Sequence, residues 1–206
     1  MLAEDNVRQG FFELPQFFLI LSHLADHVQP VIRFAFITGW RCMSEVLPLQ
    51  WDQVDFQAEI VRLEPGTTKN KRARVFPMTA DLKQLLSEQW SKHQELRDLG
   101  IDCPWVFPYN GGRFKSFKRA WQTACRKAGI SSRIPHDFRR TAVRNLTRAG
   151  IVERVAMEMT GHLTRSVFER YNIVSHGDVE HAKITLDSKV GTFSGTKDSR
   201  GLDSID

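Results

Sequence analysis

The segment from residue 51 to residue 78 is the part of this sequence that most restricts its fold. It contains three short β-prone runs, at 54–56, 60–63 and 73–76, and turn-forming residues separate each run from the next. Residues 64–70 would join the second run to the third. We therefore predict a small three-stranded antiparallel sheet placed between helical segments.

Helical spacing of apolar residues dominates the chain on both sides of this segment. It predicts an amphipathic helix over 14–27, followed by a buried helix over 31–38 that ends at Gly39. Glycine is a natural helix terminator because it tolerates positive φ. Another helix is predicted from near Arg41 to Pro48. Later helices are predicted at 80–99, 114–128, 137–149, 152–159 and 165–171, with one short helix over 178–187.

These patterns predict an α+β fold that is mainly helical and has one small sheet. The 206 residues suffice to bury a substantial core, and the sequence has no internal repeats. We expect a lead-in at 1–10, one folded domain over 11–175, a C-terminal segment at 176–189 and a tail at 190–206. The tail is rich in Gly, Ser, Thr and Asp, so we expect it to be disordered.

The composition is that of a globular protein of the cytoplasm. The longest apolar runs, at 17–21 and 34–37, are far too short to span a bilayer, and the N-terminus lacks a signal-peptide pattern. The three cysteines, Cys42, Cys103 and Cys125, form no CxxC pair. This spacing disfavours a disulfide framework or a zinc site and fits a reducing compartment.

Positive charge is concentrated in one late part of the sequence. The whole chain has a formal net charge of +5, whereas the segment from Arg113 to Arg170 has fourteen Lys and Arg against four acidic residues, a net charge of +10. Clustered Lys and Arg indicate a polyanion partner, since each phosphate that they neutralise releases counterions. A solvated helix face gives the same pattern, so charge alone leaves both interpretations open.

A histidine and an arginine stand at the start of the helix predicted over 137–149. His136 and Arg139 follow Pro135 with a spacing of three, which places both side chains on one helical face. A helix N-terminus favours an anion, and arginine offers phosphate oxygens a fork of donors. In the alternative interpretation, His136 caps the helix and Arg139 pairs with a surface acid.

Arg41 lies in an otherwise apolar segment, in the first turn of a predicted helix, with Glu45 one turn later. A buried arginine needs an anion. That anion is either Glu45 itself or a substrate phosphate toward which Glu45 aligns the guanidinium. Lys69 falls in the turn predicted between the second and third strands, where a lysine is ordinarily solvated.

Tyr171 is one of only two tyrosines in the chain, the other being Tyr109. It follows His162 by nine residues, and His162 is placed by a turn at Gly161. A phenol that follows a series of cations is a candidate nucleophile for a phosphate. Taken alone, however, Tyr171 is more often a core or rim aromatic, and His162 is more often an ordinary surface or half-buried histidine.

In order and spacing, these residues resemble the catalytic domain of the tyrosine recombinases, the phage integrase family. The similarity extends from about residue 11 to residue 174 and includes supporting strings at 47–51, 75–77 and 169–171. Each string is weak alone, but together they are specific. The positions that carry the resemblance are Thr38, Gly39, Arg41, Glu45, Lys69, His136, Arg139, Gly161, His162 and Tyr171.

The resemblance implies a catalytic set of Arg41, Lys69, His136, Arg139, His162 and Tyr171. The tyrosine would attack a DNA phosphodiester, forming a 3′-phosphotyrosyl bond and releasing a 5′-hydroxyl. The two arginines would hold the non-bridging oxygens, and the lysine would protonate the departing 5′-oxygen. The first histidine would assist proton movement around the tyrosine, and the second would hydrogen-bond the phosphate.

The resemblance also implies the partners of such an enzyme. It would act on double-stranded DNA, self-associate into a recombination synapse and work in the nucleoid of a bacterial or phage-derived system, without a membrane. Neither a metal nor a nucleotide cofactor is expected: the sequence has no GxxxxGK[ST] loop and no carboxylate cluster suited to two-metal catalysis. In relatives the segment after the tyrosine often docks on a neighbouring protomer, which is the role we expect for 176–189.

The sequence departs from the family pattern in a few places. Arg140 stands where many relatives carry a second histidine, and Phe138 where leucine is common. Family members usually have an N-terminal helical domain that closes a clamp on DNA, whereas only about ten residues precede the resemblance here. We therefore expect weaker site-specific binding by this chain alone.

The residues leave four alternatives to an integrase open. A resolvase of chromosome or plasmid dimers has the same catalytic domain, and a type IB topoisomerase uses related chemistry with a different spacing. A non-catalytic DNA-binding module could keep the fold after losing activity. A helical basic scaffold or RNA binder would leave the ordered residues as coincidence.

Overall fold

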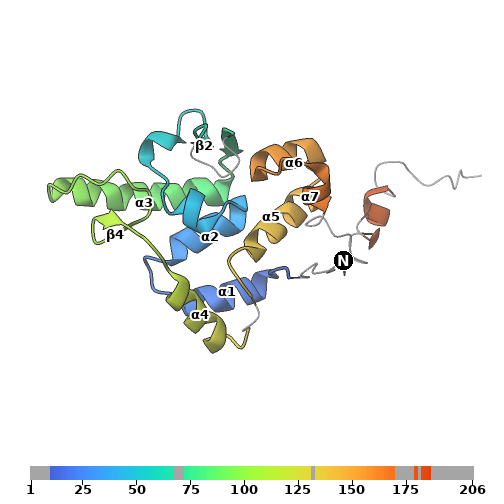
Figure 1. The fold of residues 1–206 in the computed structure, drawn as a ribbon, viewed down its shortest axis with the longest axis horizontal. Coiled ribbons are helices and arrows are strands. Elements are labelled where there is room, and N and C mark those ends of the chain that lie inside the picture. Colours follow the sequence, from blue (N-terminus) through green and yellow to red (C-terminus); the bar gives the residue numbers. More distant parts are fainter. Residues whose placement is uncertain (1–9, 67–71, 131–132, 170–178, 181, 187–206) are drawn as a thin grey trace, which may run out of the picture. The chain divides into compact units, whose positions relative to one another are not determined.

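The computed structural model describes residues 10–66, 72–130, 133–169, 179–180 and 182–186 (Figure 1). The chain divides into two compact units, Met1–Ile173 and Val174–Asp206. In the second unit, residues 179–180 and 182–186 are helical, within the range where a short helix is predicted. The predicted disordered tail at 190–206 lies outside the described residues. No described helix combines the length and the apolar character that a membrane crossing requires.

The first unit is mainly helical, as the sequence predicts. Besides the α-helices it contains a π-helix, η1 (Cys42–Val46), and a 3-10 turn, η2 (Trp51–Gln53). The α-helices are α1 (Leu14–Ser22), α2 (Gln29–Thr38), α3 (Ala80–Asp98), α4 (Lys118–Lys127), α5 (Asp137–Arg148), α6 (Glu153–Thr160) and α7 (Arg165–Glu169).

Two predicted helices are longer than the helices in the structure. The helix predicted over 14–27 ends at Ser22, where the backbone tightens into i+3 hydrogen bonds such as that from the Leu24 N–H to the Leu21 carbonyl (3.0 Å). Leu24 is nevertheless buried, so its apolar character reflects packing from a turn rather than helical continuation. The helix predicted over 114–128 begins only at Lys118, because the buried Phe114 and Phe117 pack against the core from the segment before it.

The predicted meander is confirmed. Strands β1 (Val54–Asp55), β2 (Ile60–Leu63) and β3 (Arg74–Pro77) form an antiparallel sheet in the order β1-β2-β3. Val61 pairs with Phe76 in its register. Side chains along β3 alternate, so Arg74 and Phe76 are buried on one face while Val75 is exposed on the other.

A second hairpin, β4 (Pro108–Tyr109) with β5 (Gly112–Arg113), was not predicted. Its two-residue turn is Asn110-Gly111, with φ of 49° and 73°. An Asn-Gly pair is the usual sequence signal for such a turn because both residues tolerate positive φ. The sequence therefore does carry a local signal for this hairpin.

Aromatic rings from four helices meet around Phe138 of α5, whose side chain is fully buried. Ring centroids of Trp121 (α4), Phe17 (α1) and Phe36 (α2) lie 5.2, 6.1 and 6.2 Å from that of Phe138. The Phe12 ring is closer still, at 4.7 Å. This cluster fixes the N-terminal end of α5, and therefore the position of Arg139.

Helices α2 and α5 pack against each other (Figure 1), and a glycine permits their closest approach. Gly39 ends α2 with φ of 67°, and a Cβ at that position would lie 2.7 Å from the Ala142 Cβ. The residue must therefore be glycine both for its backbone conformation and for the space available. This contact brings the chain leading to Arg41 beside the first turn of α5.

We predict that Phe138→Ala lowers the free energy of unfolding by about 3–5 kcal/mol, because it removes a fully buried ring and leaves a cavity. Urea denaturation followed by circular dichroism would measure the change. Phe18→Ala is the matched control, because the Phe18 side chain is 58% exposed and its loss should cost less than about 1 kcal/mol. Equal effects of the two substitutions would contradict this account of the core.

Candidate active site

Three of the predicted site residues line one cavity of about 230 Å³. Arg41 reaches it from the segment after α2, and His136 and Arg139 reach it from the start of α5. His162 is not part of the lining, but it is hydrogen-bonded to Arg139. Lys69 and Tyr171 lie outside the described residues, so their positions stay predictions.

Arg41 precedes a π-helix rather than the predicted α-helix. In η1 the Val46 and Leu47 N–H groups donate to the Arg41 and Cys42 carbonyls at 3.1 and 2.8 Å. The wider turn lets Glu45 fold back on Arg41: its two carboxylate oxygens accept the Arg41 backbone N–H (2.8 Å) and Nη1 (2.7 Å). The Arg41 side chain remains 25% exposed. Glu45 thus aligns Arg41 while the guanidinium still borders the cavity.

Arg74 on β3 is a buried member of this cluster that the sequence analysis missed. Its Nη1 donates to Glu45 Oε2 at 2.9 Å, and both side chains are almost completely buried. Burial alone would raise the pKa of Glu45, but the charge of Arg74, together with the bonds to Arg74 and Arg41, holds that pKa below its ordinary value. The sequence does contain a signal for this residue, because strand alternation places Arg74 on the same face as Phe76.

Arg139 is buried, in contrast to the alternative of a surface ion pair. Its Nη1 donates to the Gly39 carbonyl (3.2 Å), its Nη2 to the Gly161 carbonyl (3.0 Å) and its Nε to His162 Nε2 (3.1 Å). These partners come from the end of α2 and from the turn between α6 and α7. Arg139 therefore joins the segment at Gly39 to the segment at Gly161, which lie more than a hundred residues apart in the sequence.

His162 is held as a neutral imidazole. Its Nε2 accepts a hydrogen bond from Arg139, so Nδ1 carries the hydrogen and donates to Thr160 Oγ1 at 2.8 Å. The Thr160 hydroxyl in turn donates to the Ala156 carbonyl at 2.6 Å. Burial and then the charges of Arg139, Arg41 and Arg74 lower the pKa of His162 to about 3.

His136 differs from His162 in its exposure to solvent. Its side chain does not cap α5 within the described structure, so the capping alternative is wrong. Desolvation of its covered side, followed by the charges of Arg139 and Arg41, lowers the pKa of His136. A neutral histidine at the rim of a cationic cavity is able to accept a proton.

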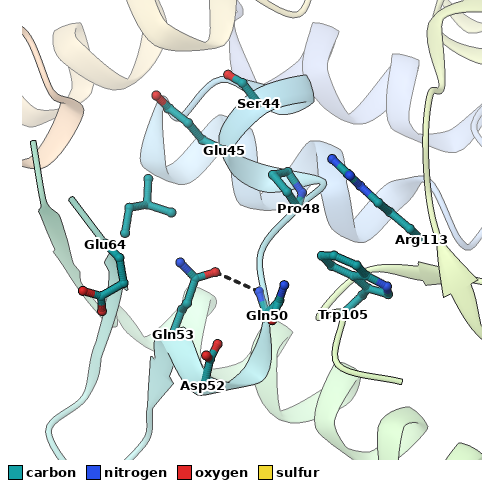
Figure 2. A pocket seen from close by; sticks show the side chains of 10 residues that line it. Ser44, Glu45, Pro48, Gln50, Asp52, Gln53, Glu64, Trp105 and Arg113 are labelled. Atoms are coloured by element: carbon teal, nitrogen blue, oxygen red, sulfur yellow. Dashed lines mark hydrogen bonds between the residues drawn. The ribbon is translucent and has the colours of Figure 1, made fainter. Parts of the chain in front are cut away.

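Two further cavities adjoin the first. One, of about 430 Å³, shares Ser44 with it, and Figure 2 shows Arg113 and Trp105 on one of its sides. The Arg113 guanidinium lies 5.4 Å from the centre of the Trp105 ring. The other, of about 490 Å³, shares Met43 and His136 with the first cavity and is also lined by Lys118 and Arg133. Cationic side chains thus line each of the two cavities that share residues with the first.

The arrangement is suited to a single tetrahedral anion. Two arginines and a neutral histidine face one cavity, and hydrogen bonds within the fold fix the positions of the arginines. Preorganised donors of this kind stabilise the charge that develops on a phosphoryl group without reorganising during the reaction.

We predict that His162 makes the protein less stable in acid. The unfolded chain binds a proton at His162 near pH 6.5, whereas the folded protein binds it only near pH 3. As the pH falls through this window the unfolded state gains the proton first, so the free energy of unfolding decreases by up to about 1.4 kcal/mol per pH unit.

Denaturant unfolding between about pH 5 and pH 6.5 would measure this slope. His162→Gln keeps an acceptor for Arg139 but does not titrate, so the variant should show a shallower slope than the parent. Identical slopes would show that His162 is not a buried neutral histidine.

Comparison with known proteins places this chain in a family. The sequence model of the phage integrase family matches residues 13–177. The integrase of Salmonella phage P22 is 26% identical over 188 residues, which are 84% of this chain and 46% of the relative. The virulence plasmid integrase pGP8-D of Chlamydia muridarum is 26% identical over 154 residues, 73% of this chain and 44% of the relative. The chain spans less than half the length of either relative.

Solved structures show the same fold. The XerA recombinase superposes with a TM-score of 0.69 at 19% identity, covering 85% of this chain and 64% of that structure. A lambda integrase dimer bound to a core site gives 0.64 at 15% identity, covering 84% and 62%. The fold of the first unit is thus that of a tyrosine recombinase catalytic domain, and the chain belongs to the phage integrase family.

Proposed function

We propose that this chain is the catalytic part of a site-specific DNA recombinase, which cleaves and rejoins DNA through a covalent 3′-phosphotyrosyl intermediate. The observation that carries the proposal is the meeting of Arg41, His136 and Arg139 at one cavity, in a member of the phage integrase family. These residues come from two segments far apart in the sequence, and partners within the fold orient both arginines.

In the proposed reaction the Tyr171 oxygen attacks the phosphorus atom of a phosphodiester. The bond to the 5′-oxygen breaks, and Lys69 supplies the proton that makes it a 5′-hydroxyl. Arg41 and Arg139 bind the non-bridging oxygens and stabilise the charge of the pentacoordinate transition state. Because the phosphotyrosyl bond retains the phosphodiester energy, attack by a different 5′-hydroxyl reverses the step and exchanges strands.

The histidines take different parts in this mechanism. His136 is exposed, with a lowered pKa, so it is suited to accept the phenol proton of Tyr171. His162 Nε2 instead accepts a hydrogen bond from Arg139 in the free protein. It can donate to the phosphate only after Nε2 gains a proton. A bound phosphate would favour that change, because its negative charge raises the pKa of a neighbouring histidine.

The cavities next to the catalytic one support a path for the DNA strand. The nucleotides on the two sides of the scissile phosphate would lie over them, with Arg113 on one side and Lys118 and Arg133 on the other. We also propose that the chain works in the bacterial cytoplasm, at the nucleoid, and self-associates on DNA. The lambda integrase neighbour is a dimer on its core site, and segment 176–189 is our candidate for the contact between protomers.

We predict a protein–DNA adduct that survives denaturation when the chain is incubated with a nicked suicide substrate carrying its cognate site. The adduct should form in EDTA and should disappear in Tyr171→Phe, which lacks the attacking oxygen. Gel electrophoresis of radiolabelled DNA would measure it. Tyr109→Phe is the matched control and should keep the parent yield.

An adduct that persists in Tyr171→Phe would refute the choice of nucleophile. If the parent binds DNA but forms no adduct on any cognate site, the chain is instead a DNA-binding module without catalysis.

We predict that the flanking cations bind DNA phosphates. Arg113→Gln and Lys118→Gln should each weaken DNA binding and reduce the slope of log K against log salt by about 0.9 for each phosphate that is no longer neutralised. Fluorescence anisotropy over a range of salt concentrations would measure both effects. Arg97→Gln makes the same charge change on α3, outside all three cavities, and should leave the slope unchanged. An equal change in all three variants would contradict the proposed strand path.

A further inference from the structure

Arg74 makes contacts that join three parts of the active site. It is only 3% exposed, on the inward face of β3, where an apolar residue would ordinarily pack beside Phe76. Its Nη1 donates to Glu45 at 2.9 Å, and its Cζ lies 5.8 Å from the centre of the Trp40 ring. A buried guanidinium is costly unless its hydrogen bonds are satisfied, so its presence here calls for an explanation.

The first connection leads to Arg41. Glu45 Oε2 accepts hydrogen bonds from Arg74 Nη1 and from the Arg41 backbone N–H, while Oε1 binds the Arg41 guanidinium. The carboxylate is 1% exposed and therefore needs a positive partner to remain ionised. Arg74 supplies that charge from the buried side, and the Arg41 guanidinium is left at the cavity.

The second connection leads to His162 and Arg139. The Arg74 guanidinium lies so close to Gly161 that a Cβ on this glycine would collide with it. Gly161 has φ of 71°, its carbonyl accepts Arg139 Nη2, and the next residue is His162. Arg74 therefore packs directly against the turn that supports both residues.

We propose that Arg74 is a positioning residue, which holds Arg41 through Glu45 and the Gly161–His162 turn through direct packing, so that the two sides of the phosphate site keep a fixed separation. This inference rests on the proposed function. Arg74 does not touch the DNA in this proposal, because its side chain is only 2% exposed. Lysine cannot replace it fully, since an ammonium is not a planar group that can donate to Glu45 from one nitrogen while its other atoms lie against Gly161.

The first test needs no DNA and therefore does not depend on the proposed function. The carboxyl of Glu45 is titrated by carbon-13 NMR in the parent, in Arg74→Lys and in Arg74→Met. We expect its pKa to rise in Arg74→Met, because burial remains while the charge that lowers this pKa most is removed. The Arg41 guanidinium resonance should broaden or shift toward that of a free arginine. Unchanged signals in both variants would overturn the proposal.

The second test measures cleavage separately from binding. With Arg74→Lys, which keeps the charge and guards against simple misfolding, we expect single-turnover adduct formation at saturating DNA to slow by about 100-fold, the effect of a displacement near 1 Å. The dissociation constant for DNA should stay within about threefold of the parent. Arg62→Lys, on the exposed side of the neighbouring strand, is the matched control and should keep the parent rate.

A double-mutant comparison separates positioning from a general loss of stability. If Arg74 acts on Arg41 through Glu45, then Arg74→Lys combined with Glu45→Gln should be about as slow as the slower single variant. If the rate losses of the two single variants instead multiply in the double variant, Arg74 does not act on Arg41 through Glu45, and the proposal is overturned. A loss of DNA affinity without a loss of cleavage rate would also overturn it. A parent protein that forms no adduct at all would refute the proposed function, and the Glu45 titration would then decide the role of Arg74.

Discussion

Two buried guanidinium groups, those of Arg74 and Arg139, set the conditions that the rest of the site must satisfy. Each lies inside a largely apolar domain and needs acceptors there, because an unpaired buried charge costs several kcal/mol. Glu45 accepts a hydrogen bond from Arg74, whereas two backbone carbonyls and a neutral histidine accept hydrogen bonds from Arg139. The tight turns at Gly39 and Gly161 supply those carbonyls.

The same constraint explains the protonation of the site. Burial, and then the charges of several nearby arginines, disfavour an additional proton, so the pKa values of His136 and His162 lie below that of a free histidine. Near neutral pH the site therefore combines permanent cations with neutral imidazoles. A bound anion would relieve the repulsion among these cations, which agrees with the phosphate site that we propose.

Much of this was predictable from the sequence. The helical spacing, the three β-prone runs and the glycine turns indicated the architecture, because each is a local property of the chain. Two errors occurred where packing or a turn overrides the local pattern: Leu24 is buried from a turn, and η1 is a π-helix. The Asn110-Gly111 hairpin differs, because its turn does have a local sequence signal. Arg74 was missed as a site residue because a basic residue in a strand is ordinarily solvated.

The sequence by itself determined the residue types of the site, their order and the family to which they point, since chemistry of this kind depends on side-chain identity and spacing. Only the tertiary structure decided which of them meet. Arg41 and Arg139 share a cavity because α2 packs on α5 through Gly39, and His162 faces Arg139 because Gly161 turns the chain back. Such contacts depend on the shape of the packed core, and no spacing along the chain encodes that shape locally.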